Sequence, residues 1–557
     1  MKTKYKAIIV AAIMLLAGVY YYWAFPAINI HLSGFWICLA VIFVLMGSIL
    51  GMQNSVIRLI QGTERFSMRD STKLTKFFWF LAGVSVLVLL GGYLSGASLF
   101  RAKTYADLLT VQERSFEEDI EESNRVTDIA LMDTESARIF GNRKIGSLSD
   151  VVSQYEVEAD YTQISIDKSP MKVSSLKYAS FFKWWNNRQN GVPGYVQVNP
   201  VNSEAQYVKL KKGMKYVPSG FFNHNLQRHV QFRYPTKIIT GYQFEVDDEG
   251  NPYYVCPTVS ARVGLFGGMD VNGVILCDPV SGDCQYYKVD DCPAWVDSVY
   301  NGHLLEQKYN WHGMLSGGFW NSIIGQKGCR QATDDFGYKI IGDDVWVYTG
   351  VTSANGDQSN IGFVMMNQRT SEARYYKVSG AEEHSAMSAA EGEVQEKGYK
   401  ASFPSLINVA GVPTYVMVLK DDGGLVKLYA MVNVEQYNIV ATASTQTKVF
   451  ENYKKLLASS DSVPQVENTK QEAEITVESV QYIDTEDGTV VYIKDTDHKA
   501  YKQAFKENEQ LILISAGDRI TVTYEESDSG IYALESYSFA NGTSADDKKD
   551  EADQAAS

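Results

Sequence analysis

Sequence signatures of enzyme catalysis are missing from this chain of 557 residues. It contains no Gly-x-Ser-x-Gly nucleophile elbow, no phosphate-binding loop and no dinucleotide-binding fingerprint. Its 7 histidines include no His-Glu-x-x-His pair, and its 6 cysteines include no Cys-x-x-Cys pair. These absences remove support for the best-known hydrolase, nucleotide-binding, zinc-peptidase and thiol-exchange classes. We therefore predict no catalytic residues, no metal ligands and no cofactor.

Positive charge is scarce beyond the first 100 residues. Eight of the 51 Lys and Arg residues and two of the 66 Asp and Glu residues lie in residues 1–100, so residues 101–557 carry 43 basic against 64 acidic groups. A surface of that charge repels phosphate backbones, and we predict no nucleic-acid partner. The apolar content of 45% is enough to bury cores, and the length corresponds to three or four domains at ~150 residues each.

Three runs without charged side chains are long enough to cross a bilayer, which takes about 20 apolar residues. They comprise residues 7–24, 34–52 and 77–100. We predict that residues 1–100 form a three-helix membrane anchor. The basic N-terminus also fits a cleavable secretory signal, but the first run ends in aromatic residues without a small-x-small cleavage site.

The Lys and Arg residues set the orientation of this anchor. Three of them precede the first run and five lie in residues 54–76, whereas none lies in residues 26–32. Basic segments next to membrane spans stay in the cytoplasm. The prediction is a multi-pass protein of the cell membrane, with the lipid bilayer as a partner, the N-terminus cytoplasmic and residues 101–557 extracytoplasmic.

One pattern occurs three times in the outer region: an apolar run, a turn of Asn/Asp, Pro or Ser/Gly type, and an aromatic run, which together predict a β-hairpin. The copies are residues 194–210, 273–289 and 362–378. Helix-like stretches follow at residues 221–230, 293–304, 381–396 and 445–457. The predicted fold class is therefore α+β. Tandem antiparallel sheet-plus-helix modules fill residues 165–458, after a membrane-proximal polar collar at residues 101–164.

The second copy contains the turn Asp-x-x-Ser-Gly-Asp, from Asp278 to Asp283, between an apolar strand and an aromatic strand. This hairpin, with a helix beside it, resembles the PepSY domain, a small bacterial module that occurs in tandem outside the membrane. The third copy departs from the pattern, with Thr370 to Glu372 where the turn usually has Gly. The whole chain also resembles uncharacterised multi-span bacterial membrane proteins. The PepSY resemblance implies binding or restraint of peptides, peptidases or other envelope proteins.

The C-terminal region changes in composition twice. Residues 459–471 are polar and predict a linker, whereas residues 472–540 alternate apolar and polar positions in several short strands. Short strands over about 65 residues predict a small β-barrel resembling an oligonucleotide/oligosaccharide-binding (OB) fold. Residues 541–557 lack aromatic side chains and predict a disordered acidic tail.

Cys277 and Cys284 are the candidate disulfide. With a turn at residues 279–282 they face one another across the hairpin, where paired β-carbons approach within ~4.5–5.5 Å. Two buried free thiols are an equal alternative at this stage, and a zinc site is the least favoured.

The aromatic cluster of residues 181–185 is the candidate partner contact. Trp184 and Arg188 are the residues we expect to meet a partner, with Trp184 pointing outward. The alternative is that the helical spacing of this cluster forms a buried helix face, which the spacing favours.

Together these patterns predict a membrane-anchored extracytoplasmic binding or scaffold protein that engages another envelope protein or peptide without catalysis. Two alternatives stay open. One is an envelope hydrolase whose carboxylates come from separate modules, and the other is a transmembrane sensor or regulator. The sequence does not define an oligomeric state.

Overall fold

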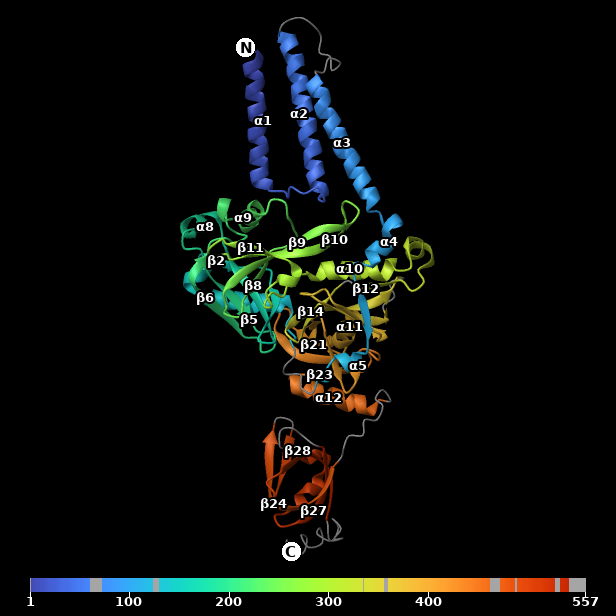
Figure 1. The fold of residues 1–557 in the computed structure, drawn as a ribbon. Coiled ribbons are helices and arrows are strands. Elements are labelled where there is room, and N and C mark those ends of the chain that lie inside the picture. The colour runs from blue at the N-terminus through green and yellow to red at the C-terminus, as the bar shows by residue number, and fades with distance from the viewer. Residues whose placement is uncertain are drawn as a thin grey trace. The chain divides into compact units, whose positions relative to one another are not determined.

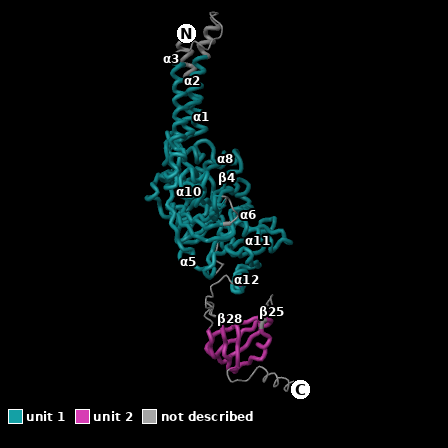
Figure 2. The backbone as a smooth tube through the Cα atoms, turned by 90° about the vertical axis from the view of Figure 1, so that its right-hand side faces the viewer, with its two compact units in different colours: residues 1–459 teal, residues 460–557 magenta. Residues whose placement is uncertain are grey.

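The computed structural model describes residues 2–60, 73–123, 130–333, 335–354, 359–460, 471–485, 488–525 and 531–539. The chain divides into two compact units, residues 1–459 and residues 460–557, which Figure 2 shows in different colours. Most of the predicted linker and all of the predicted acidic tail lie outside the described residues.

Three long helices begin unit 1 and run side by side in Figure 1: α1 (Lys2–Ala24), α2 (Ser33–Ile60) and α3 (Lys73–Ser95). Among the described residues, two segments are long and apolar enough to cross a membrane, Ser33–Gly51 and Lys73–Ser95. The sequence predicted three membrane-spanning helices, and only two of the described helices are long and apolar enough. Only 11% and 17% of these two segments is buried, whereas the core helix of a soluble protein is mostly buried.

Four mainly antiparallel sheets of five or six strands follow one another in the described part of unit 1 after these helices (Figure 1). Within each sheet the third strand in sequence pairs with the first, the second and the fourth, and the fourth pairs with the fifth. Sheet 1 contains β2 (Tyr155–Val157), β3 (Thr162–Ile166), β4 (Ser169–Tyr178), β5 (Val192–Val198) and β6 (Ala205–Met214). Sheet 2 contains β7 (Ile238–Ile239), β8 (Gln243–Val246), β9 (Pro252–Val263), β10 (Gly267–Cys277) and β11 (Cys284–Tyr287).

Sheets 3 and 4 have the same pairing order. Sheet 3 contains β12 (Arg330–Ala332), β13 (Gly337–Ile341), β14 (Asp344–Ser353), β16 (Gly362–Asn367) and β17 (Ala373–Tyr376). Sheet 4 contains β19 (Lys400–Ala401), β20 (Ser405–Val409), β21 (Val412–Lys420), β22 (Val426–Asn433) and β23 (Val440–Ala443). Sheet 3 also gains β1 (Val111–Arg114), a segment of the predicted collar, which pairs in parallel with β17.

Neighbouring sheets pack face to face, so their central strands are buried on both sides. Tyr254 and Ile275 of sheet 2 belong to the core shared with sheet 1, whereas the adjacent Val255 and Val274 belong to the core shared with sheet 3. Phe363 of sheet 3 then packs with sheet 4. This alternation follows from the two-residue period of a strand, and it explains why these strands are apolar along their whole length.

One helix follows each sheet: α9 (Leu226–Arg233), α10 (Gly302–Leu315), α11 (Glu383–Gly392) and α12 (Gln446–Ser459). The prediction of a helix at residues 293–304 is wrong, because α10 begins only at Gly302. The side chain of Asn301 accepts a hydrogen bond from the amide of Leu304 and so caps the helix at that point.

Unit 2 is a closed barrel with the strand order β24-β25-β26-β28-β27. Its strands are β24 (Gln471–Thr485), β25 (Gly488–Asp495), β26 (Ala500–Ala504), β27 (Arg519–Glu525) and β28 (Ile531–Phe539). The prediction of a small barrel is confirmed. Residues 509–513 form a 3₁₀-helix that places Leu511 in the barrel core.

Candidate functional site

The three predicted hairpins are hairpins in the structure, and their turns share one hydrogen-bond pattern. Asn199 and Asp278 directly follow a strand and Asn367 ends one. The side-chain oxygen of each accepts hydrogen bonds from two backbone amides of the turn, at distances of 2.7–3.3 Å. Short polar side chains commonly fix turns in this way. The pattern holds the strands on both sides of each turn in the same register.

Cys277 and Cys284 flank the turn of the second hairpin as a cross-strand pair, so their predicted juxtaposition is confirmed. Both are free thiols, with 3.1 Å between the two sulfur atoms. The predicted disulfide is therefore not formed in this structure. The corresponding pairs in the other two hairpins are Val198 with Ala205 and Met366 with Ala373.

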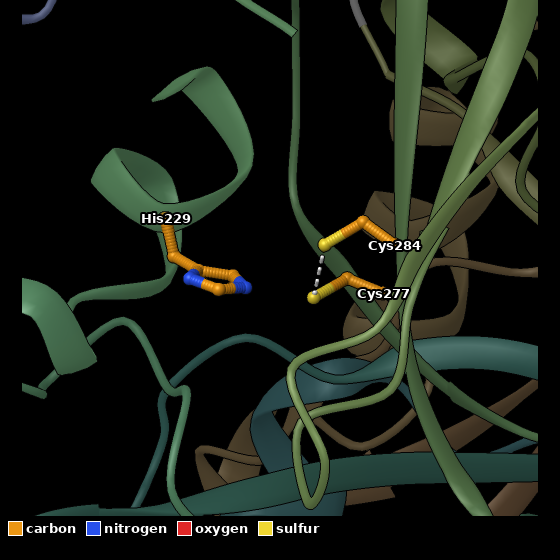
Figure 3. Close-up of side chains that lie close together, drawn as sticks. All are labelled: His229, Cys277 and Cys284. Atoms are coloured by element: carbon orange, nitrogen blue, oxygen red, sulfur yellow. Dashed lines mark hydrogen bonds between the residues drawn. The ribbon is translucent and has the colours of Figure 1, made fainter. Parts of the chain in front are cut away.

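His229 is a third member of this cluster, and the sequence reasoning missed it. Helix α9 places its imidazole opposite the two sulfur atoms, as Figure 3 shows, and the ligand atoms of the three residues all lie within 4.8 Å of one another. The Nε2 atom of His229 is 2.7 Å from the carbonyl oxygen of Gly282, in the hairpin turn. The ring also packs on Tyr216, with 4.1 Å between centroids.

The two thiols have unequal acidities because one donates to the other. The Cys277 thiol and nearby His229 stabilise the Cys284 thiolate and lower the pKa of Cys284 to about 6. The same hydrogen bond, together with burial, raises the pKa of Cys277. Cys256, on the same buried face of sheet 2, has a raised pKa because it is buried. Cys284 is thus the activated thiol of the cluster.

Two kinds of chemistry fit these atoms. Two thiolates and an imidazole are donors that Zn²⁺ or Cu⁺ accepts, with a further ligand supplied from outside the cluster. A dithiol with one ionised sulfur also forms a disulfide when an external disulfide oxidises it. The second reaction leaves the contact between His229 and Gly282 in place. The geometry therefore favours dithiol chemistry.

The expectation that Trp184 points outward is wrong. Helix α8 (Phe181–Asn187) turns Trp184 into the core of sheet 1, where it is 3% exposed and packs on Phe221. Its neighbours Phe182 and Trp185 are instead 74% and 48% exposed. Arg188 lies over the ring of Trp185, 4.0 Å from its centroid. The exposed aromatic surface exists, but Trp184 is not part of it.

Two adjoining cavities lie where the sheets meet, with volumes of about 600 Å³ and 460 Å³. Gln163 of β3 and Tyr338 of β13 line both cavities. The larger cavity is also lined by β20, and the smaller one by β8 together with Tyr161, Tyr242 and Tyr254. Tyrosines and amide side chains offer both apolar faces and hydrogen-bonding groups, which suits a ligand of mixed polarity.

Acidic side chains outnumber basic ones in both cavities: Asp119, Glu121 and Glu122 line the larger one beside Lys168 and Lys339, and Glu158 and Asp160 line the smaller one. Lys339 lines the larger cavity and donates to the carbonyl oxygen of Leu406 at 3.1 Å, while burial lowers the pKa of its amino group to about 8. Glu158 and Asp160 line the smaller cavity, and burial raises the pKa of Glu158. An extended ligand that occupied both cavities would meet carboxylates in each of them, and lysines only in the larger one.

Two buried carboxylates from different segments also meet in unit 1. Glu245 of β8 accepts the backbone amides of Asp297 and Ser298 at 3.0 and 2.9 Å, and Asp297 accepts the amide of Ser165 at 2.7 Å. Burial raises the pKa of both acids, and the charge of Glu245 raises that of Asp297 further. Neither acid lines the two cavities described above. Their role is to fix the segment before α10 against sheets 1 and 2.

The comparisons with known proteins give no identity. No family model matches the sequence, and a search of curated proteins finds no match. Among solved structures, a levansucrase variant from B. megaterium is 7% identical, with 74% of this chain and 97% of the levansucrase chain covered and a TM-score of 0.17. A TM-score of that size does not indicate a shared fold, so nothing is transferred from that enzyme.

Proposed function

We propose that this chain is a membrane-anchored binding or scaffold protein of the bacterial envelope, which holds a peptide or a protein segment without catalysis. The observation that carries the proposal is the pair of adjoining cavities that share Gln163 and Tyr338. The two apolar helices α2 and α3 supply two spans of this anchor, and α1 is proposed as the third. The N-terminus is cytoplasmic, and the sheets of unit 1 and the barrel are extracytoplasmic.

The finer architecture belongs to the same proposal. The four sheets are copies of one PepSY-like module, and their common strand pairing and the shared turn hydrogen bonds support this reading. The barrel is OB-like, with a closed five-stranded sheet in which β26 and β28 run parallel. Neither module brings a catalytic motif in the sequence, which favours binding over chemistry.

A peptide fits the cavities better than a purely apolar ligand does. The carboxylates that line both cavities, among them Glu121 and Glu158, match the ammonium end or the basic side chains of an extended peptide. Tyr338 at the junction of the cavities provides an apolar face for an uncharged residue of the same peptide. The proposal thus predicts a preference for peptides that carry basic residues.

In-cell photo-crosslinking of the full chain tests this function. p-Benzoylphenylalanine replaces Lys168 at the rim of the larger cavity or His303 at the rim of the smaller one. The matched control carries the same group in place of Lys212, an exposed residue of β6 outside both cavities. We expect peptide or protein adducts at the two rim positions and none at the control. Equal adducts at all three positions would contradict a binding site in the cavities.

A further inference from the structure

Exposed aromatic side chains gather around the ends of helices α1 to α3 that meet the sheets. Trp23 in the last turn of α1 is 59% exposed, and Tyr93 near the end of α3 is 58% exposed. Trp36, near the start of α2, donates its indole N–H to the carbonyl oxygen of Ile30. Aromatic residues concentrate where a membrane span leaves the hydrocarbon layer. These positions mark the membrane boundary of the proposed anchor.

A first apolar patch lies on unit 1 next to the end of α1, near helices α8 and α9 in Figure 1. We call it the α8 patch. Its side chains are 37% to 74% exposed: Phe181, Phe182, Trp185, Phe221, Phe222 and Phe232. A soluble surface rarely leaves so many adjacent aromatic rings uncovered.

The α8 patch is fixed to the end of α1 by direct contacts. The ring of Phe232 stacks on Tyr21, with 5.7 Å between centroids and an interplanar angle of 8°. Arg228 donates to the carbonyl oxygens of Tyr22 and Phe222 at 2.8 and 2.6 Å, so one side chain bonds both the helix and the patch. The patch is therefore held at the level of the membrane boundary.

A second apolar patch follows α10, and we call it the α10 patch. It consists of Trp320, Ile323 and Ile324, which are 65%, 57% and 77% exposed. Beside α10 runs α4 (Ser98–Ala106), whose Phe100 is 69% exposed.

Helix α4 connects the α10 patch to α3. The ring of Tyr105 in α4 packs on Trp311 of α10 at 5.0 Å, and its hydroxyl donates to the carbonyl oxygen of Gly96, just after α3. The second patch is thus tied to the end of α3 as the first is tied to the end of α1.

We propose that the α8 and α10 patches both insert into the headgroup region of the bilayer, so that the sheets of unit 1 lie directly on the membrane. This inference rests on the proposed membrane anchoring. The occupant is lipid because the patches continue the exposed apolar surface of helices that contact lipid. Their insertion is driven by apolar burial, since the acidic excess of residues 101–557 gives no general attraction to anionic lipids.

Two points of insertion, one at α1 and one at α3, would fix how unit 1 is oriented on the membrane. A single anchor point would leave the sheets free to tilt about the helix ends. With both patches inserted, the two cavities would keep a constant orientation relative to the bilayer. The aromatic cluster of residues 181–185 would then contact lipid and not a protein partner.

Photo-crosslinking to lipid in nanodiscs that hold the full chain tests this inference. p-Benzoylphenylalanine replaces Phe182 in the α8 patch or Ile324 in the α10 patch, and adducts to a clickable phosphatidylcholine are measured. Leu87, 68% exposed in the middle of α3, is the positive control, and Tyr437, 56% exposed between β22 and β23, is the negative control. In Figure 1, β23 lies at the far end of the sheets from α1 to α3.

We expect lipid adducts at Phe182 and Ile324 that approach the yield at Leu87, with none above background at Tyr437. Adducts at Leu87 alone would overturn the inference and leave the membrane anchor standing. No adduct at Leu87 would overturn the anchor itself. A protein adduct at Phe182 in intact cells, without a lipid adduct there, would assign the α8 patch to a protein partner and also overturn the inference.

Discussion

A cysteine reacts as its thiolate, so the lowered pKa of Cys284 has a direct chemical consequence. In the reduced protein we expect iodoacetamide to alkylate Cys284 with a midpoint near pH 6, whereas Cys292, whose pKa burial raises to about 12, stays unreactive at neutral pH. The substitution Cys277→Ala removes the hydrogen-bond donor and should move the midpoint for Cys284 towards the ordinary cysteine value of about 8.5. Peptide mass spectrometry after alkylation at a series of pH values measures both midpoints.

The control for that experiment is His229→Gln, which keeps the donor Cys277. It should shift the Cys284 midpoint upward by less than Cys277→Ala does, because the hydrogen bond from Cys277 is the largest cause of the lowered pKa. An unchanged midpoint in Cys277→Ala would contradict the assignment of that cause. Alkylation without prior reduction reports the state of the pair in the cell, since an oxidised pair does not label.

Glu245 makes folding stability depend on pH. Its folded-state pKa is raised to about 7 by burial, so the folded chain binds the proton more tightly than the unfolded chain, whose glutamates titrate near pH 4.3. Stability is therefore highest below about pH 4.3 as far as this group is concerned, and it falls as the pH rises towards 7. Each pKa unit between the two states corresponds to about 1.4 kcal/mol.

The substitution Glu245→Gln should flatten this dependence. We expect the thermal midpoint of the wild-type chain to fall between pH 5 and pH 8, and that of the variant to fall less. The exposed residue Glu204 provides the matched control, Glu204→Gln, which should leave the wild-type slope unchanged. Equal slopes in Glu245→Gln and the wild type would refute a proton bound at Glu245.

At the scale of single residues, a contact could be predicted from the sequence where the pairing of two strands joined by a short turn determines it. Cys277 and Cys284 are separated only by a short turn, so the hairpin pattern alone places them opposite one another. His229 reaches them from α9, through tertiary packing that no local pattern encodes. Trp184 was assigned to the wrong side because a helix as short as α8 has too few apolar positions to define its buried face.

At the scale of elements, the three hairpin turns share a position where the backbone φ is positive, but the residue at that position is not the same in all three. Gly282 adopts φ +83° in the second turn, whereas Ser203 adopts +62° at the same place in the first. A left-handed conformation costs an L-residue roughly 1 kcal/mol, and glycine avoids that cost. We therefore expect Ser203→Gly to stabilise unit 1 by up to about 1 kcal/mol.

The reciprocal substitution Gly282→Ser should have the opposite sign and a larger size. A β-carbon at residue 282 would lie 2.4 Å from the ring of Tyr216, so steric overlap adds to the backbone strain. Thermal unfolding of the two variants beside the wild type checks the pair. Destabilisation by Ser203→Gly would show that the serine side chain contributes more than its backbone conformation costs.

Whether a strand could be predicted from the sequence depended on its length. The long hairpin strands carry enough alternating positions to be found, whereas the edge strands β2, β7, β12 and β19 have only two or three residues each and carry no pattern. The segment before α10 looks helical in composition. It is not helical because Glu245 binds the amides of Asp297 and Ser298, a tertiary contact that local propensity does not include.

At the scale of the whole molecule, charge and hydropathy were enough to separate the apolar N-terminal helices from the acidic remainder. They did not show which contacts hold these helices to the sheets, because those contacts are a few polar interactions between residues far apart in sequence. Arg228 is the clearest example. It is 5% exposed, donates to the carbonyl oxygens of Tyr22 and Phe222, and lies 4.4 Å from the centroid of the Tyr22 ring.

The substitution Arg228→Gln should uncouple α1 from the sheets. Hydrogen bonds from a charged donor contribute about 1.5–3 kcal/mol each, so we expect a loss of roughly 3 kcal/mol in the unfolding free energy of unit 1. Lipid crosslinking at Phe182 should fall in the variant, because the α8 patch is no longer held at the end of α1, whereas crosslinking at Leu87 inside α3 should not change. Arg233→Gln, an exposed arginine on the same helix, is the control that should alter neither quantity. If Arg228→Gln lowered stability but left the Phe182 adduct intact, Arg228 would stabilise the fold without positioning the patch, and the contacts of Phe232 with Tyr21 would have to hold it there.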